Sequence, residues 1–219
     1  MAEKAVIWGA GGHAKVVADI LRLSGLEVVG FLDEVNSGRR GQPFFGSVVL
    51  GGVEQLDSLL HSGVRRAFVG FGNNWRRLEA GNLLESRGFE LVKAIHPAAV
   101  VAADVKLGAG TMVAAGAVVN PGSGIGKNVI VNTRASIDHD CVVDDGAHVG
   151  PGASVAGSVI IGRCAWLCIG STIIDKKRVG ADSIVGAGAV VIHDVPDGAA
   201  VAGVPAQMLR RAKKGDNLL

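Results

Sequence analysis

Between Val101 and Val195, aliphatic residues recur at every sixth position without interruption. The first position of each hexad is Val, Ile or Leu, and the fifth is small or β-branched except at Lys177. A period of six fits neither a helix nor a simple alternating strand, and it is typical of a parallel β-helix. The pattern therefore predicts stacked coils of three hexads, or 18 residues, with the aliphatic side chains in the bore and the small residues at the corners.

The chain before the hexads follows a different pattern. An apolar run at Lys4–Trp8 predicts a buried strand, and a glycine-rich turn at 9–13 leads to a helix at 14–23 and a second strand at Glu27–Leu32. Such a βαβ unit offers free N–H groups and a helix dipole to an anion. The pattern GxGxxA, with an acidic residue about 20 positions later, is similar to a dinucleotide fingerprint.

This fingerprint has two other interpretations. The turn could simply pack the helix on the strand and bind nothing. In addition, only about 90 residues precede the coils, too few for the two halves of a complete NAD-binding fold. A mononucleotide or nucleotide-sugar site is therefore favoured over a dinucleotide site.

The remaining segments complete three predicted domains, at 1–94, 95–204 and 205–219. A polar connection at 34–52 precedes a short helix at 53–61, a third strand at 66–71 and a helix at 75–86. Asn73 follows the third strand, on the side where ligands bind in open α/β sheets. After the hexads, a short basic helix at 207–214 is expected to cap the last coil, with a solvated end formed by Arg210, Arg211, Lys213 and Lys214.

Composition narrows these expectations. Hydrophobic residues make up 48% of the chain, aromatic residues only 4%, and there are 33 glycines, so small aliphatic residues must build the core. A net charge of +2 argues neither for nor against an anionic partner, and no basic stripe is broad enough to suggest a nucleic-acid partner. No apolar stretch matches a signal peptide or a membrane span, and the three cysteines form no disulfide framework. We expect a cytoplasmic protein.

The most polar strip of the hexads, residues 132–141, contains the best candidate for chemistry. His139 and Asp140 take the third and fourth positions of their hexad, so both should project from a corner. A surface histidine is usually only solvated, but one flanked by two carboxylates gains basicity and suits a general base. Gly157 follows His139 by 18 residues, one coil above it, where its N–H could polarise a carbonyl group.

His148 follows His139 by nine residues, or half a coil, and so lies on the far side of the prism. The two histidines cannot share a site within one chain. If both act in one reaction, a neighbouring subunit must contribute one of them, which predicts a trimer with sites between prisms. An outward side chain without a role is the alternative for His148.

Several motifs together resemble one known family. The turn GAGGHA, the following FLDE, GNN after the third strand, the unbroken hexads and NTRASIDHDC resemble the bacterial sugar O- and N-acetyltransferases. That family includes enzymes that acetylate UDP-4-amino-4,6-dideoxysugars in the bacillosamine pathway, and sialic acid O-acetyltransferases. The resemblance covers nearly the whole chain. It implies a Rossmann-like α/β domain followed by an all-β left-handed parallel β-helix, a homotrimer with active sites between subunits, and acetyl-coenzyme A as donor without a metal.

The resemblance also implies roles for individual residues. His139 matches the catalytic base and Asp140 its supporting acid, while Asn132, His148 and Gly157 match positions near the acetyl group. The nucleotide of the sugar substrate is expected at Gly9, Gly11, Gly12, His13, Asp33, Glu34 and Asn73. The coenzyme is expected along Gly157, Ile169, Gly186, Ala187, Gly188, Gly203 and Pro205.

Two departures leave the acceptor open. Gln207 replaces the lysine that ends the familiar GVPAK motif, and Asp140 stands where N-acetylating relatives often have Glu. Aspartate also occurs in O-acetylating relatives. We therefore expect transfer to the 4-amino group of a UDP-linked sugar, with sugar O-acetylation of the sialic acid type as the alternative.

Two more distant alternatives belong to other functional classes. A zinc carbonic anhydrase built on similar coils needs three converging histidines, and only His139 and His148 are well placed here. A non-catalytic assembly protein would not need the polar strip at 132–141 or a separate nucleotide-binding domain.

Overall fold

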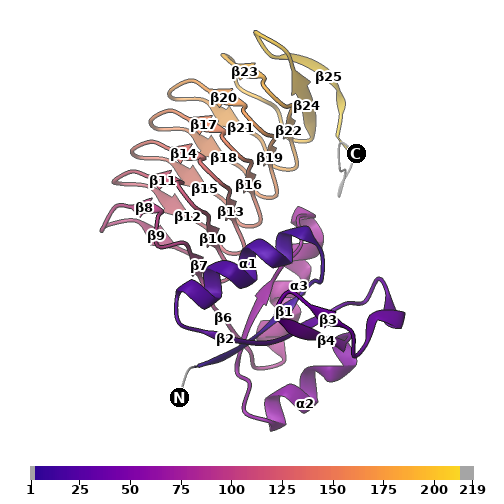
Figure 1. Cartoon of the computed structure of the whole chain (residues 1–219). Helices are drawn as coiled ribbons and strands as arrows, with labels where there is room; N and C mark the ends of the chain where they lie inside the picture. The colour runs from indigo at the N-terminus through magenta and orange to yellow at the C-terminus, as the bar shows by residue number, and fades with distance from the viewer. Residues whose placement is uncertain (1–2, 213–219) are drawn as a thin grey trace.

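The structure is a computed structural model that describes residues 3–212. It consists of an α/β domain from which a tapering stack of coils rises (Figure 1). Six strands form the sheet of the α/β domain in the order β3-β4-β2-β1-β5-β6. Their bounds are β1 Lys4–Trp8, β2 Glu27–Leu32, β3 Pro43–Phe44, β4 Ser47–Gly51, β5 Arg66–Val69 and β6 Glu90–Leu91. The predicted βαβ unit is present, because β1 lies between β2 and β5 and pairs with both in parallel.

Three helices and two short 3₁₀ turns accompany this sheet. They are α1 Gly12–Leu23, η1 Ser37–Arg39, η2 Val53–Gln55, α2 Leu56–His61 and α3 Asn74–Ser86. Helix α1 buries Val17, Ile20 and Leu21 because these residues recur at helical spacing. The side-chain oxygen of Asn73 accepts a hydrogen bond from the backbone N–H of Arg76 and so caps α3.

The expectation of an irregular connection at 34–52 was wrong in part. Strands β3 and β4 form a hairpin in this segment, and β4 also pairs in parallel with β2. The turn between them places Phe45 and Gly46 at positive φ. Phe44 packs edge-on against Phe31, with ring centroids 4.8 Å apart. The glycine-rich composition of the segment concealed strands that depend on this tertiary packing.

The coils follow the predicted 18-residue register. Met112, Ile130, His148, Trp166 and Ile184 are successive partners on one face of the stack. Face 1 comprises β7 Ala94–Ile95, β10 Met112–Val113, β13 Ile130–Val131, β16 His148–Val149, β19 Trp166–Leu167, β22 Ile184–Val185 and β24 Ala199–Ala202, joined by β25 Gln207–Arg211. Face 2 comprises β8 Val100–Val101, β11 Val118–Val119, β14 Ser136–Ile137, β17 Ser154–Val155, β20 Thr172–Ile173 and β23 Val190–Val191. Face 3 comprises β9 Lys106–Leu107, β12 Gly124–Ile125, β15 Val142–Val143, β18 Ile160–Ile161 and β21 Arg178–Val179.

Three edges join these faces, and each is named by the faces that it connects. In a representative coil, edge 1–2 spans residues 132–135, edge 2–3 spans 138–141 and edge 3–1 spans 144–147. The fourth hexad position lies at positive φ in every hexad from Gly110 to Gly188. This requirement explains why Gly, Asn and Asp are common there, since these residues adopt the left-handed conformation most easily.

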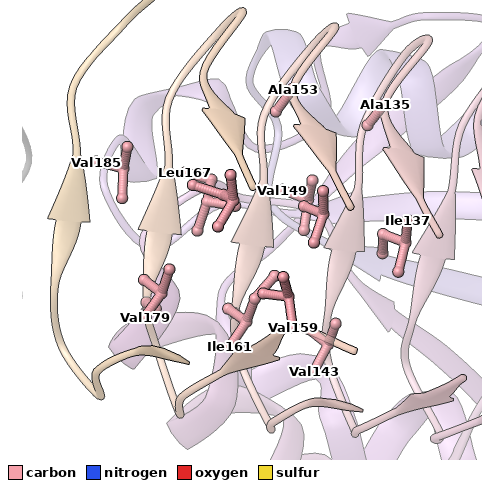
Figure 2. Packing of buried hydrophobic residues seen from close by; sticks show 14 of the residues in the cluster. Ala135, Ile137, Val143, Val149, Ala153, Val159, Ile161, Leu167, Val179 and Val185 are labelled. Carbon is pink, nitrogen blue, oxygen red and sulfur yellow. The ribbon is translucent and has the colours of Figure 1, made fainter. Parts of the chain in front are cut away.

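The first and fifth hexad positions fill the bore of the prism, as predicted. Figure 2 shows Val149, Leu167 and Val185 stacked from coil to coil, and all three are completely buried. Small residues such as Ala135 and Ala153 are buried at the corners. The main core cluster of this domain therefore runs along the axis of the stack and holds the edges rigid.

The α/β domain packs on the lower coils through two helices. Helix α1 lies on face 1, where its apolar side joins Met112 and Ile130 in one buried cluster. Helix α3 lies along edge 3–1, where the Asn74 side chain donates hydrogen bonds to the carbonyl oxygens of Cys164 and Ala165. Ala114, on edge 1–2 of a lower coil, belongs to the same cluster as α1.

The predicted C-terminal helix was wrong. Strand β25 pairs antiparallel with β24 and extends face 1 beyond the last coil. A strand in this position satisfies backbone groups that the end of the stack would otherwise leave unpaired. Arg210 and Arg211 lie on this strand, whereas Lys213 and Lys214 are outside the described residues.

A pair of Leu-to-Ala variants tests the role of the bore. Leu167 is completely buried and Leu209 is 67% exposed. Leu167→Ala should lower the free energy of unfolding by about 2–5 kcal/mol because it leaves a cavity between coils. Leu209→Ala should change it by less than about 0.5 kcal/mol. Urea unfolding followed by circular dichroism measures both, and equal effects would contradict the assignment of the core.

Candidate active site

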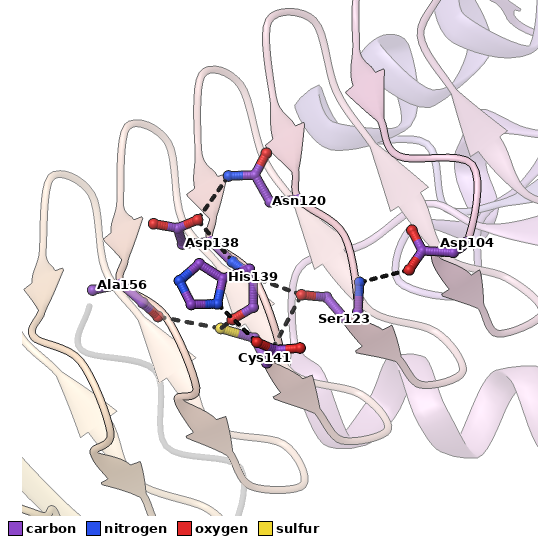
Figure 3. A network of polar contacts seen from close by, with 9 residues as sticks. Asp104, Asn120, Ser123, Asp138, His139, Cys141 and Ala156 are labelled. Carbon is purple, nitrogen blue, oxygen red and sulfur yellow. Dashed lines mark hydrogen bonds and ion pairs between the residues drawn. The ribbon is translucent and has the colours of Figure 1, made fainter.

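His139 lies on edge 2–3, between β14 and β15, and its imidazole lies on the outside of this edge, toward the next coil, which carries Ala156 (Figure 3). Its side chain is 59% exposed. Its backbone N–H donates to Oδ1 of Asp138 at 2.8 Å, and the Asn120 side chain donates to the same oxygen at 2.8 Å. The hydrogen bond from Asn120 is the main reason that the pKa of Asp138 lies below its usual range. A fixed negative charge therefore lies beside the imidazole.

Asp140 holds the ring of His139 from the other side. Nδ1 of His139 lies 2.8 Å from Oδ2 of Asp140. Because an ionised carboxylate only accepts hydrogen bonds, Nδ1 carries the proton and Nε2 keeps a free lone pair. The hydrogen bond to Asp140, followed by the charge of Asp138, raises the pKa of His139 above its ordinary 6.5. Asp140 itself lies at φ 57°, a conformation that Asp tolerates better than most residues.

Gly157 lies directly against this imidazole, one coil above it as predicted. A Cβ at Gly157 would be 2.7 Å from both Cε1 and Nε2 of His139. The chain is in register at this point, because the Ser158 N–H donates to the carbonyl oxygen of His139 at 2.9 Å. Among residues 3–212, the N–H of Gly157 has no hydrogen-bond acceptor. A base and a free N–H donor are thus adjacent on one exposed edge.

A Gly157→Ala variant tests whether this close approach matters. The new methyl group should push the imidazole away from Asp140, so the turnover of the enzyme should fall steeply while the fold is retained. Gly124→Ala is the matched control, because a Cβ at Gly124 meets no atom within 4 Å. Activity assays and thermal unfolding of both variants make the comparison. Wild-type turnover of Gly157→Ala would contradict this geometry.

The pH profile tests the contribution of Asp140. Since the base must be unprotonated and its pKa is raised, the acid limb of kcat/KM should lie above pH 6.5. Asp140→Asn removes the main cause of that shift, so the limb should move to lower pH. The maximum rate should also fall, by less than the roughly 10²–10⁴-fold that a general base contributes. Asp144→Asn, on edge 3–1, is the control, and an unmoved limb in Asp140→Asn would sink this assignment.

His148 lies on face 1, away from edge 2–3 with His139. Its burial differs from the alternative of an outward side chain without a role. Only 9% of it is exposed, because the α/β domain covers this part of face 1. Its ring stacks on that of Trp166, with centroids 6.0 Å apart and planes 11° apart. Burial is the main reason that its pKa lies well below 6.5, with smaller contributions from Arg77 and His13. His148 is therefore neutral.

Asn132 is the hydrogen-bond partner of His148. Its Oδ1 accepts from the backbone N–H of Thr133 at 2.8 Å, which leaves Nδ2 to face Nε2 of His148 at 3.1 Å. This amide orientation makes Nε2 of His148 the acceptor and places its proton on Nδ1. The structure thus brings together two of the residues expected near the acetyl group, on and beside edge 1–2.

The other residues expected to bind the coenzyme continue along edge 1–2. Gly170 donates to the carbonyl oxygen of Pro151, and Gly188 donates to that of Ile169, so equivalent positions are stacked coil on coil. Edge 1–2 therefore carries Ile169, Gly186, Ala187 and Gly188, with Gly203 and Pro205 following β24 at its upper end. His139 and Gly157 lie on edge 2–3, so one chain does not bring the two sets together.

All seven residues expected to bind the nucleotide line one pocket of about 910 Å³ in the α/β domain: Gly9, Gly11, Gly12, His13, Asp33, Glu34 and Asn73. The pocket lies at the carboxyl ends of β1, β2 and β5, at the N-terminus of α1. Gly9 is required at this turn because it has φ 128°, and a Cβ would come within 2.8 Å of the Gly70 carbonyl oxygen. The volume of the pocket is in the range found for small-molecule sites.

Asp33 is already engaged within the pocket. Its Oδ2 accepts from Arg39 at 2.8 Å, and its Oδ1 accepts from the N–H groups of Val35 and Asn36. The same guanidinium group of Arg39 donates to the carbonyl oxygen of Ala10 at 2.9 Å. Asp33 therefore organises the wall of the pocket, and the neighbouring Glu34 presents the more accessible carboxylate.

Sequence reasoning missed several residues of this pocket. Arg39, Arg76, Glu79 and Phe71 line it, and the two arginines supply positive charge. Arg39 lies within the segment 34–52, which was expected to be a polar connection, and Arg76 lies on a helix whose orientation the sequence did not determine. The only signal in the sequence was the general expectation that a cation lies close to a glycine-rich turn that binds an anion.

The described part of the chain shows two further features. Cys141, Cys164 and Cys168 are buried free thiols, and burial raises the pKa of Cys164 and of Cys168 to about 11. Within residues 3–212, no group of three or more His, Cys, Asp or Glu residues is arranged to hold a metal ion. No helix in the same range has the length and apolar character to cross a membrane.

Comparison with known proteins identifies the family. Residues 4–82 match the family model described as the PglD N-terminal domain. The structure is similar to a mutant of GDP-perosamine N-acetyl transferase from Caulobacter crescentus in complex with CoA and GDP-perosamine. The two share 40% sequence identity and a TM-score of 0.92, over 96% of this chain and 98% of that one. The chain belongs to the hexapeptide-repeat sugar N-acetyltransferase family.

A second solved structure supports the same assignment. The acetyltransferase domain of PglB from Neisseria gonorrhoeae, in complex with acetyl coenzyme A, is 38% identical, with a TM-score of 0.89. The match covers 95% of this chain and all of that domain. The predicted family, fold class and enzyme class, acetyl-coenzyme A-dependent acetyltransferase, are therefore confirmed.

A curated relative matches only part of the chain. The 2,3,4,5-tetrahydropyridine-2,6-dicarboxylate N-acetyltransferase of Staphylococcus aureus is 40% identical over 75 residues. These residues make up 31% of each protein, so the chain spans about a third of the length of this relative. A match of this extent bears on the shared segment and says nothing of the acceptor.

Proposed function

We propose that this protein transfers the acetyl group of acetyl-coenzyme A to the amino group of a nucleotide-linked amino sugar. The observation that carries the proposal is the pairing of an exposed imidazole at His139, oriented by Asp140, with the free N–H of Gly157. The pocket of about 910 Å³ in the α/β domain supports a nucleotide as the handle of the acceptor. UDP remains the predicted nucleotide, and the relative that binds GDP-perosamine makes GDP the second nucleotide to test.

The proposed chemistry is direct transfer. The amine of the sugar attacks the thioester carbonyl, a C–N bond forms, and Nε2 of His139 takes the proton that the amine loses. The N–H of Gly157 stabilises the oxyanion while the C–S bond breaks. The proton then passes to the departing sulfur, which yields the coenzyme A thiol. Cys141, the cysteine nearest to His139, is buried and points its sulfur at the carbonyl oxygen of Ala156, so it is not available as a nucleophile.

The positions of the two edges support the proposal of a trimer. The residues assigned to the coenzyme lie on edge 1–2, and the base lies on edge 2–3 of the same chain. A site that uses both edges needs two copies of the chain. Closed rotational symmetry repeats that contact three times around a triangular prism. The active site is therefore proposed to lie between neighbouring coil stacks of a homotrimer.

The experiment that tests this function measures thiol release from acetyl-coenzyme A with separate acceptors. The acceptors are a UDP-linked and a GDP-linked 4-amino-4,6-dideoxysugar, and free sialic acid. Turnover with a nucleotide-linked amino sugar is the expected result, and the preferred nucleotide identifies the base that the pocket accepts. Turnover with sialic acid alone would indicate O-acetylation in place of N-acetylation. The absence of thiol release with all of these acceptors would overturn the proposal.

A histidine variant tests the assigned base. His139→Ala should lower turnover by about 10²–10⁴-fold, since that is the usual contribution of a general base. Coenzyme A binding, measured by calorimetry, should be largely retained. His193→Ala is the control, because His193 is an exposed histidine near the far end of the stack. A His139→Ala enzyme with near wild-type turnover would remove His139 from the mechanism.

A further inference from the structure

Arg77 is a completely buried cation in the contact between the two domains. Among residues 3–212, no carboxylate forms an ion pair with it, and its hydrogen bonds go to backbone and amide oxygens. Burial lowers its pKa to about 9, so it stays charged at neutral pH. Burying a charge without an ion-pair partner costs free energy, so the hydrogen bonds of Arg77 must offset that cost.

The planar guanidinium group of Arg77 joins two distant parts of the chain. Nη1 donates to the carbonyl oxygen of Gly72 at 2.9 Å and reaches that of Phe71 at 3.5 Å. Both residues line the nucleotide pocket. Nη2 donates at 2.8 Å to the carbonyl oxygen of Gly146, on edge 3–1 of the coil stack. One rigid group therefore fixes the distance between the pocket wall and a coil.

That coil leads directly to the polar residues of edge 1–2. Nη2 of Arg77 also contacts the carbonyl oxygen of Ala147 at 3.3 Å, and the next residue is His148. Nε2 of His148 in turn receives the hydrogen bond of the Asn132 side chain at 3.1 Å. A continuous path of hydrogen bonds and one covalent step thus connects the pocket wall to Asn132.

We propose that Arg77 is a positioning residue that holds the nucleotide pocket at a fixed place relative to the His148–Asn132 pair on edge 1–2. It thereby determines where an acceptor anchored in the pocket meets the acetyl group. The proposal rests on the proposed function, since the acceptor and the acetyl group belong to it. Misplacement of reacting groups by about 1 Å can cost 10²-fold in rate, so such a distance matters for catalysis.

A second contact between the domains provides a matched control. Nε1 of Trp75 donates to Oδ1 of Asp182 at 2.6 Å, and its ring lies under the guanidinium group of Arg163 at 4.4 Å. Trp75 also lies on α3 and docks it to edge 3–1, but none of these contacts reaches the pocket wall or the Gly146–Ala147 segment. Trp75→Phe therefore removes this hydrogen bond at the same interface and leaves the side chains of Arg77, His148 and Asn132 unchanged.

The test compares Arg77→Lys, Arg77→Met and Trp75→Phe with the wild type, at a temperature where circular dichroism shows all four folded. Arg77→Lys keeps a cation but has three donors on one atom in place of the guanidinium fork. Both Arg77 variants should lower kcat by about 10- to 100-fold. Their KM for the nucleotide sugar, and the Kd of UDP, GDP and coenzyme A by calorimetry, should change much less. Trp75→Phe should lower Tm while keeping kcat.

Hydrogen–deuterium exchange provides a readout that does not depend on turnover. Arg77→Lys should speed exchange in the peptides that contain residues 70–73, 132–134 and 146–148, and Trp75→Phe should not. An Arg77→Lys enzyme with wild-type kcat, or a Trp75→Phe enzyme that loses kcat equally, would overturn the positioning role. Unchanged exchange at 132–134 in both Arg77 variants would do the same. A wild-type enzyme without turnover would instead sink the proposed function, and the exchange data would then decide the role of Arg77.

Discussion

The register of the coils is the constraint on which the rest of this structure depends. From β7 to β23, strands that pair in parallel are 18 residues apart, so the sequence position of a residue determines its face, edge and height. Aliphatic residues in the bore maintain this register, because a slip of one residue would turn every buried side chain outward. The position of Gly157 against His139 is a direct consequence, since the two are one coil apart.

The same register places different kinds of residues on the three edges of the prism. Edge 2–3 presents a base and a free N–H, edge 1–2 presents a stacked row of small residues, and edge 3–1 is occupied by α3. The rigid core means that these edges cannot approach one another within one chain. In the proposed function, assembly with other copies of the chain brings separate edges into one site, and the α/β domain supplies the acceptor to it.

Much of this arrangement could be predicted from the sequence, because the hexads specify geometry as well as fold. The partnership of His139 and Gly157 follows from counting, as does the separation of His139 from His148. The burial of His148 could not be predicted, since it depends on where α1 and α3 of another domain pack. Strand β25 could not be predicted either, because this basic segment was expected to form a helix but pairs with an open sheet edge.

Arg77 shows the same limit more sharply. On a helix of low amphipathicity, its position gives no sign of complete burial, and its partners are carbonyl oxygens that leave no trace in a sequence. The ion pair between Asp33 and Arg39 could not be predicted either. From the sequence alone, an acidic residue after such a strand indicates a ligand for a ribose, and only the structure shows that Arg39 contacts it. Interactions with backbone atoms across long sequence separations are thus the part that required the structure.

A crystal structure of this protein with coenzyme A and a nucleotide-linked amino sugar tests the central claim most directly. The sulfur of the coenzyme and the amine of the sugar should meet beside Nε2 of His139, with that amine within about 2.6–3.2 Å of it. The pantetheine should run along edge 1–2 of a neighbouring copy, and the nucleotide should occupy the pocket beside Gly9. A complex in which the two substrates meet away from His139 would contradict the account.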